Sequence, residues 1–129
     1  MEHALRQILP NVRIGKILIQ RKEDGSAEAQ LFYTKVPQDI SERTVLLLDP
    51  MLATGGSAIC AIAELIKMGV KEEHITFLNM VAAPEGIKAV LSVYPKIKII
   101  SCALDKELNE QKYILPGLGD VGDRYFGTD

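Results

Sequence analysis

Apolar and polar residues are distributed along the middle of the chain in a way that predicts three buried strands joined by two helices. Residues 44–49 (TVLLLD) form a continuous apolar run, which is typical of a strand buried on both faces of a parallel sheet. Helical spacing follows over residues 57–68, then a strand over residues 75–82, a helix over residues 84–93 and a strand over residues 97–104. This alternation predicts an α/β fold, a parallel sheet with flanking crossover helices.

The segment before the predicted sheet indicates a β-hairpin. Residues 12–22 and 29–36 alternate between apolar and polar side chains, and Asp24-Gly25 between them is a strong hairpin-turn signal. We therefore expect a protruding hairpin over residues 12–36.

The first nine residues predict a short amphipathic helix that ends at Pro10. Its apolar residues share one helical face: Ala4, Leu5, Ile8 and Leu9. A doubly wound fold normally opens with a strand. We therefore expect the N-terminal part of a longer protein, including a helix and a strand, to be missing from this sequence.

The last quarter of the chain lacks a periodic pattern. Residues 105–129 are rich in glycine and aspartate, which predicts a long irregular segment that is either functional or disordered. A length of 129 residues predicts one domain, residues 1–129.

Composition and charge exclude several classes of protein. Apolar residues make up 47% and charged residues 25%, as in soluble globular proteins. A formal net charge of −2 gives no general attraction to nucleic acid or to an anionic membrane. The sequence starts without the apolar core of a signal peptide, so we expect a cytoplasmic protein. Cys60 and Cys102 lie in apolar segments and are expected to be buried free thiols.

A loop of small residues follows the predicted strand 44–49. Gly55 and Gly56 allow the backbone to approach a ligand closely, and the helix that starts near Ser57 adds its N-terminal dipole and free N–H groups. Ligands of open α/β sheets bind at the carboxyl ends of the strands, where Asp49 is expected. A phosphate on the loop and a sugar hydroxyl on Asp49 together indicate a phosphorylated sugar. The alternative is a tight strand–helix turn in which Ser57 caps the helix.

Four stretches of the chain together resemble the uracil phosphoribosyltransferases, which are type I phosphoribosyltransferases. The stretch DPMLATGGS (49–57) is similar to their motif for phosphoribosyl diphosphate (PRPP), and Pro50 in place of a second acid marks the uracil enzymes. LIQRKE (18–23), AAPEGI (82–87) and the C-terminal YILPGLGDVGDRYFGTD (113–129) agree with this family. The resemblance covers essentially the whole chain and corresponds to the C-terminal half to two-thirds of such an enzyme.

The resemblance implies transfer of phosphoribosyl from PRPP to uracil, which gives UMP and pyrophosphate and salvages the pyrimidine. The reaction is a substitution at the anomeric carbon through an oxocarbenium-like transition state, so positioning and electrostatics supply the catalysis. No side chain is needed as a nucleophile, and His3 and His74 have no assigned role. Magnesium is the expected cofactor, entering with PRPP, and no residue is assigned as a direct metal ligand.

The resemblance also implies which residues contact PRPP. Asp49, Asp120 and Arg21 would be catalytic: Asp49 bonds the ribose hydroxyls, Asp120 positions PRPP or its metal, and Arg21 stabilises the departing pyrophosphate. Without the resemblance, Asp120 would instead be a turn aspartate in a glycine-rich loop, and Arg21 would be a solvated strand residue. The 5′-phosphate would be bound, chiefly by backbone N–H groups, at Pro50, Met51, Leu52, Ala53, Thr54, Gly55, Gly56 and Ser57.

Uracil, by the same resemblance, would bind to main-chain atoms of the C-terminal segment. Pro116 helps to hold that main chain rigid. An N–H group facing O4 of uracil would exclude cytosine, because a buried polar group left unpaired costs about 1–3 kcal/mol. The residues expected to contact the base are Tyr113, Ile114, Gly119, Asp120 and Val121.

Two other functions stay open at this point. The chain could be a non-catalytic UMP- or PRPP-binding domain fused to a uridine kinase, or an enzyme for another base such as a purine. Because the upstream loop that carries further PRPP contacts is absent, we expect weak binding of phosphate or UMP and poor turnover by this chain. The family also implies a homodimer or homotetramer and GTP as a possible activator.

Overall fold

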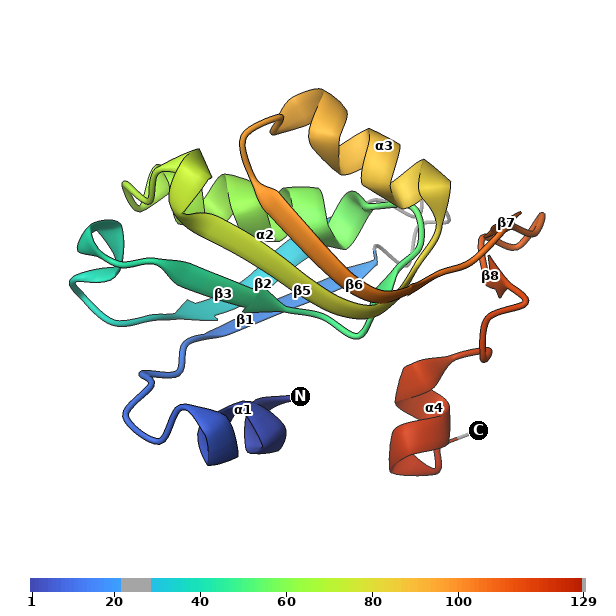
Figure 1. Cartoon of the computed structure of the whole chain (residues 1–129), viewed down its shortest axis with the longest axis horizontal. Coiled ribbons are helices and arrows are strands. Elements are labelled where there is room, and N and C mark those ends of the chain that lie inside the picture. The colour runs from blue at the N-terminus through green and yellow to red at the C-terminus, as the bar shows by residue number, and fades with distance from the viewer. Residues whose placement is uncertain (22–28, 129) are drawn as a thin grey trace.

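The computed structural model describes residues 1–21 and 29–128, and it confirms the α/β fold (Figure 1). Its helices and strands follow the chain in this order: α1 (Glu2–Ile8), β1 (Lys16–Arg21), β2 (Ala29–Lys35), the 3₁₀ turn η1 (Ile40–Glu42), β3 (Val45–Leu48), β4 (Met51–Leu52), α2 (Gly56–Lys67), the 3₁₀ turn η2 (Glu72–His74), β5 (Ile75–Ala82), α3 (Pro84–Val93), β6 (Lys98–Leu104), β7 (Glu107–Leu108), β8 (Ile114–Leu115) and α4 (Val121–Phe126). No helix in these described ranges has the length and apolar character needed to cross a membrane.

A parallel sheet forms the centre of the molecule. Strand β5 pairs with β6 along one edge and with both β3 and β4 along the other. Helices α2 and α3 cover one face of this sheet (Figure 1). The predicted order of strands and helices is therefore confirmed, with boundaries within about one residue of those expected for α2, β5, α3 and β6.

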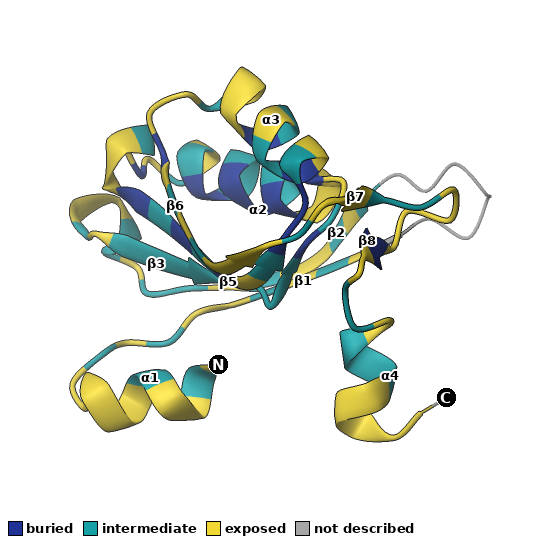
Figure 2. Ribbon diagram, turned by 45° about the vertical axis from the view of Figure 1, so that its right-hand side comes forward, coloured by how far each residue is buried: buried dark blue, intermediate teal, exposed yellow. Residues whose placement is uncertain are grey.

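The hydrophobic core lies between the sheet and α2, where Figure 2 shows most of the buried residues. Phe77 and Ile75 on β5 are fully buried, as is Ile62 on α2, so they pack at the centre of this interface.

A Schellman motif ends α2: the Gly69 N–H donates to the Ile66 carbonyl at 2.9 Å and the Val70 N–H to that of Leu65 at 3.1 Å.

The predicted hairpin is present, with β1 and β2 antiparallel and packed against α2. It begins at Lys16 rather than at residue 12, and its register shifts between Leu18 and Ile19. The predicted Asp24-Gly25 turn lies outside the described residues.

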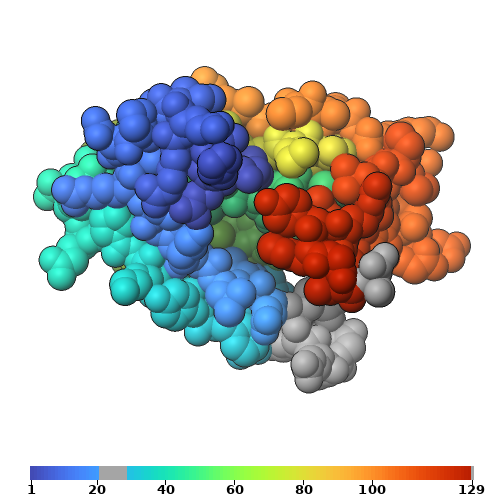
Figure 3. Space-filling view, turned by 90° about the horizontal axis from the view of Figure 1, so that it is seen from below, coloured from blue at the N-terminus to red at the C-terminus, as the bar shows by residue number. Residues whose placement is uncertain are grey.

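Helix α1 is present as predicted, but most of its apolar face is exposed, and only Leu5 on that face is partly buried. Ile8 is 77% exposed and Leu9 is 44% exposed. Figure 3 shows the N-terminal segment and the C-terminal segment on opposite sides of one face, with the middle of the chain visible between them. Glu2 forms ion pairs with Arg6 and Lys16, which tie α1 to the start of β1.

Two expectations about the rest of the chain are wrong. The tail is not irregular throughout, since β7 and β8 form a small antiparallel pair and α4 follows. Cys102 is exposed and Cys60 is only half-buried, so neither is a buried core residue. Cys102 is exposed because side chains alternate along β6: Cys102 lies on the same face as exposed Ile100, opposite the face on which Ile99 packs against the core.

Candidate functional site

The predicted strand 44–49 is interrupted at Asp49 and Pro50, which separate β3 from β4. Leu48 pairs with Leu78 and Met51 pairs with Val81, so each strand advances by three residues and the register is unchanged across the interruption. The short strand β4 is not predicted by the apolar pattern, because the acid and the proline end the apolar run.

Backbone hydrogen bonds hold this interruption against β5. The Asp49 N–H donates to the Leu78 carbonyl at 3.2 Å. The Pro50 carbonyl accepts from the N–H groups of Met80 at 3.0 Å and Val81 at 3.2 Å. Proline has no N–H to leave unpaired, so this residue is compatible with a bend in a strand at the edge of a pocket.

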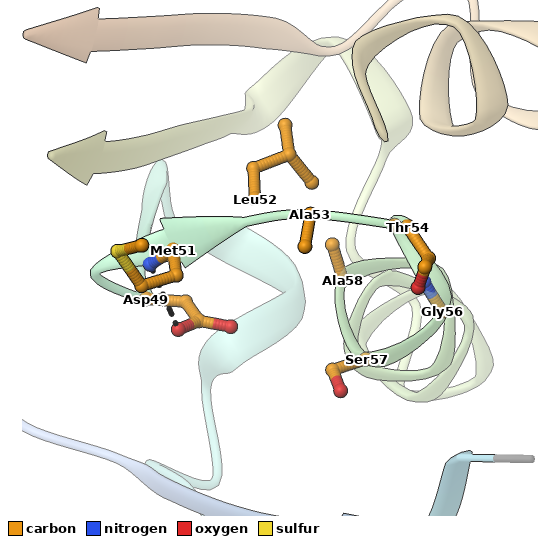
Figure 4. A pocket seen from close by; sticks show the side chains of 9 residues that line it. Asp49, Met51, Leu52, Ala53, Thr54, Gly56, Ser57 and Ala58 are labelled. Carbon is orange, nitrogen blue, oxygen red and sulfur yellow. Dashed lines mark hydrogen bonds between the residues drawn. The ribbon is translucent and has the colours of Figure 1, made fainter. Parts of the chain in front are cut away.

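The Asp49 pocket opens beside this bend and is lined by Asp49 and residues 51–58. Figure 4 shows the Asp49 carboxylate on one side of the opening and Thr54, Gly56 and Ser57 at the start of α2 on the other. The structure therefore brings Asp49 together with the predicted phosphate-binding residues. Pro50 is not among the lining residues of this described pocket.

The start of α2 supplies hydrogen-bond donors to the pocket. Gly55 is the N-cap and has a φ of +88°, a conformation that glycine adopts readily. The first helical hydrogen bond runs from the Ile59 N–H to the Gly55 carbonyl at 2.9 Å, so the N–H groups of Gly56, Ser57 and Ala58 project from the helix end. Ser57 lies inside the helix, and the alternative in which Ser57 caps it is wrong.

Helix α3 supports the loop 53–57 from behind. A Cβ added to Gly86 would lie 2.4 Å from the Ala53 carbonyl oxygen, and one added to Gly55 would lie 3.1 Å from the Gly86 carbonyl oxygen. The Ala83 N–H, just before α3, donates to the Leu52 carbonyl at 2.9 Å. The loop is therefore pressed against α3, while its other side borders the Asp49 pocket. Sequence reasoning assigned no role to Gly86, although it lies in the quoted AAPEGI stretch.

Burial changes the acidity of Asp49. Desolvation raises the pKa of its carboxyl group, and a long hydrogen bond from the Met51 N–H, at 3.5 Å to Oδ1, lowers it by less. A partly buried carboxylate with a single weak donor has free lone pairs for the hydroxyl groups of a ligand.

The residues predicted to contact a base lie on β8 and the turn after it. Ile114 is buried, at 4% exposed, whereas Tyr113 is 46% exposed. Gly117 follows Pro116 in a tight turn with a φ of +52°, and a Cβ there would lie 2.0 Å from the Ile114 carbonyl oxygen. Only glycine is compatible with this turn.

Asp120 and Val121 mark the start of α4. One carboxylate oxygen of Asp120 accepts the Asp123 N–H at 3.0 Å, which makes Asp120 the N-cap of α4. Gly119, with a φ of +76°, turns the chain into this helix. Residues 113–121 do not line the Asp49 pocket as the described residues define it. The backbone of Arg21 belongs to β1, and its side chain lies outside the described residues.

A sequence model of the uracil phosphoribosyltransferase family matches residues 1–128, which is almost the whole chain. The chain belongs to the uracil phosphoribosyltransferase family. Its Asp49 pocket and its C-terminal segment therefore lie within the part of the chain that defines membership of this family.

Two relatives with different names are similar to this chain at high identity. It is 54% identical over 129 residues to uracil phosphoribosyltransferase of Dictyostelium discoideum, a match that covers 100% of this chain and 59% of the relative. It is 57% identical over 129 residues to an Arabidopsis thaliana protein named uridine/cytidine kinase UKL1, chloroplastic, covering 100% of this chain and 26% of that protein.

A solved structure supports the fold over the full chain. The AQ2163 protein from Aquifex aeolicus is 31% identical and superposes with a TM-score of 0.87, covering 100% of this chain and 60% of that protein. The chain thus spans about three fifths of the length of its first uracil phosphoribosyltransferase relatives.

Proposed function

We propose that this chain carries the substrate-binding part of a uracil phosphoribosyltransferase, which transfers phosphoribosyl from PRPP to uracil and releases UMP and pyrophosphate. The observation that carries this proposal is the Asp49 pocket. A partly buried carboxylate faces the exposed N-terminus of a helix, so one opening offers an acceptor for sugar hydroxyls and donors for a phosphate. The relatives named uracil phosphoribosyltransferase support the same assignment.

In this proposal the 5′-phosphate lies on the loop 53–57. The N–H groups of Gly56 and Ser57 lie at the start of α2 beside the pocket, where the Gly56 N–H makes only a long hydrogen bond, 3.5 Å, to the Thr54 hydroxyl oxygen. Because α3 blocks movement of the loop away from the ligand, the donors are oriented before binding, which reduces the reorganisation needed in the transition state. Asp49 holds the ribose ring so that its anomeric carbon faces the base.

The base would be selected by main-chain groups of residues 113–121. Buried Ile114 and the turn at Gly117 give this backbone a defined conformation. A fixed N–H and a fixed carbonyl can match one edge of uracil and leave the amino group of cytosine opposite a donor. Rejection then follows from the cost of an unpaired buried group, about 1–3 kcal/mol.

Magnesium remains part of the proposal only through PRPP. The described residues contain no group of three or more histidine, cysteine, aspartate or glutamate side chains that could hold a metal ion. These residues do not form a magnesium site by themselves, so no step is assigned to the metal. Asp120 is the carboxylate that we expect near a metal-bound diphosphate, whereas Asp49 is expected to bond the ribose hydroxyls.

A second candidate function is a non-catalytic UMP- or PRPP-binding domain of a larger protein. It is favoured by the 57% identity to a protein named uridine/cytidine kinase, of which this chain matches 26%. In this case the Asp49 pocket would bind the nucleotide without turnover. We also keep self-association, cytoplasmic location and activation by GTP as expectations of the main proposal.

The test separates binding from turnover. Purified chain is titrated with ribose 5-phosphate, UMP and uracil plus pyrophosphate, and UMP formation is then measured with PRPP, magnesium and labelled uracil. Asp49→Ala should lose binding of ribose 5-phosphate, whereas exposed Glu110→Ala should bind as the wild type does. Binding without turnover favours the second candidate, and failure to bind either phosphate ligand contradicts both.

A further inference from the structure

Asp105 connects the end of the sheet to the turn proposed to contact the base. It follows the last residue of β6, and its own N–H donates to the Ala82 carbonyl at 2.9 Å. Its carboxylate oxygen Oδ2 accepts the Gly117 N–H at 2.8 Å. Asp105 is half-buried, and its backbone and side chain thus bond to two different parts of the fold.

The sheet places Asp105 in fixed relation to the phosphate-binding loop. Leu52, Ala82 and Leu104 pair with one another in a single row across β4, β5 and β6. The loop 53–57 starts one residue after this row, and Asp105 is one residue after the same row on β6. Because sheet pairing is rigid, an acceptor on Asp105 positions the turn relative to the loop.

The Gly117 N–H bonds to a partner from outside its own turn, the Asp105 carboxylate. With a φ of +52° and the Ile114 carbonyl directly beside it, Gly117 is in a conformation open essentially to glycine alone. A charged acceptor bonds a backbone N–H about twice as strongly as a neutral one, so the Asp105 carboxylate favours this conformation over others that glycine can adopt.

A second side chain from α3 holds the adjacent hairpin. Glu85 accepts the Leu108 N–H of β7 at 3.2 Å through Oε1. The Lys106 N–H donates to the Leu115 carbonyl at 2.9 Å, which closes the pair of short strands just before the turn. The helix that supports the phosphate-binding loop therefore also contacts the hairpin, and Asp105 completes the connection at the turn itself.

We propose that Asp105 is a positioning residue for the pyrimidine base. By accepting the Gly117 N–H it holds the main chain of residues 114–119 at the distance from the loop 53–57 that a nucleotide requires. This inference rests on the proposed function, since the base is uracil only if that proposal holds. It adds a role for a residue that does not line the Asp49 pocket.

The test compares two ligands that differ by the base. UMP contains the base, ribose and phosphate, whereas ribose 5-phosphate reports the Asp49 pocket alone. Asp105→Ala should weaken UMP binding by at least about tenfold, with ribose 5-phosphate affinity changed less than about twofold. Asp105→Asn keeps an acceptor oxygen and should restore most of the UMP affinity. Glu107→Ala, which removes an exposed carboxylate two residues away, should behave as the wild type.

A structural readout accompanies the affinities. The amide proton of Gly117, followed by NMR, should exchange faster in Asp105→Ala than in the wild type and should regain protection in Asp105→Asn. Asp105→Glu keeps the charge but moves the acceptor by one methylene, so it should resemble the alanine variant, and it replaces that variant if alanine prevents folding.

The outcomes separate this inference from the proposed function. Unchanged Gly117 exchange and unchanged UMP affinity in Asp105→Ala overturn the inference, as does an equal loss for ribose 5-phosphate. A wild-type chain that binds ribose 5-phosphate but not UMP or uracil overturns the proposed function instead. The Gly117 amide then decides whether Asp105 holds the turn: protection lost in the alanine variant supports that role, and unchanged protection overturns it.

Discussion

Gly86 on α3 lies directly behind the Ala53 carbonyl oxygen, so closely that a Cβ on Gly86 would approach that oxygen to 2.4 Å. The same Cβ would lie 3.0 Å from the Leu52 carbonyl oxygen. Both neighbours are backbone atoms, which cannot move aside by a simple rotamer change. The position of the loop 53–57 therefore depends on the absence of a side chain on a different helix.

Replacing Gly86 by alanine should push the loop away from α3. We expect a loss of about 1–3 kcal/mol in the free energy of unfolding, the usual cost of overpacking, together with weaker binding of ribose 5-phosphate. Urea denaturation and calorimetric titration measure the two effects. Gly56→Ala is the matched control for stability, because its Cβ would meet only the Thr54 hydroxyl at 3.8 Å. Equal stability of wild type and Gly86→Ala would contradict the proposed packing.

The raised pKa of Asp49 makes stability depend on pH in a defined direction. Burial favours the protonated carboxyl group in the folded state, so Asp49 contributes most below its ordinary pKa of 3.8, and that contribution is lost as the pH rises through the folded pKa. Asp49→Asn stays neutral at every pH. Its free energy of unfolding should therefore increase relative to that of the wild type as the pH rises through the folded pKa of Asp49. The variant should also bind ribose 5-phosphate less well. Urea midpoints measured from pH 3 to 7 test this prediction, and parallel pH profiles of the two proteins would refute it.

Asp120 has two roles that one pair of variants can separate. Asp120→Ala removes the acceptor for the Asp123 N–H and should destabilise α4 by about 0.5–2 kcal/mol. Asp120→Asn keeps an acceptor but loses the charge, so it should retain α4 and yet bind PRPP with magnesium more weakly. The helix is followed by amide NMR signals and PRPP affinity by calorimetry. Wild-type affinity for PRPP in the asparagine variant would leave Asp120 with a capping role alone.

An ion-pair cluster before the sheet predicts a separate response to acid. A side-chain hydrogen bond from Arg43, with a smaller contribution from Arg13, lowers the pKa of Asp39 from 3.8 to about 2. A lowered pKa means that the stabilisation is present above pH 3.8 and is lost as the pH falls toward 2. Asp39→Asn should therefore show a smaller loss of stability on acidification over this window, as thermal unfolding at each pH would reveal. An unchanged acid profile would rule out this contribution.

Periodicity predicted the elements that have a long apolar face. Helices α2 and α3 and strand β5 bury side chains at regular spacing, and β6 packs partly buried Ile99 against the core, so their patterns indicated both their type and their limits. The sequence also placed Asp49 and the loop 53–57 at one site, because ligands of open α/β sheets bind at the carboxyl ends of the strands, and both follow the end of a predicted strand.

Several elements that the sequence did not predict are short, and side-chain-to-backbone hydrogen bonds help to hold those of the C-terminal segment. Strands β7 and β8 are two residues long, and Asn109 closes the loop between them by accepting the Tyr113 N–H at 2.9 Å. Such bonds leave no periodic signal. The same applies to Asp105, whose role is visible only when Gly117 is placed beside it. The roles in PRPP and uracil binding came from resemblance and stay predictions.

The bend at Asp49 and Pro50 also bears on how this site could diversify. Paired residues keep the same offset on both sides of the bend. Asp49 and Pro50 therefore interrupt the strand without shifting its alignment with β5. The alignment of the sheet is kept by backbone pairing on either side of the bend, so the Asp49 side chain can face the pocket without taking part in that alignment.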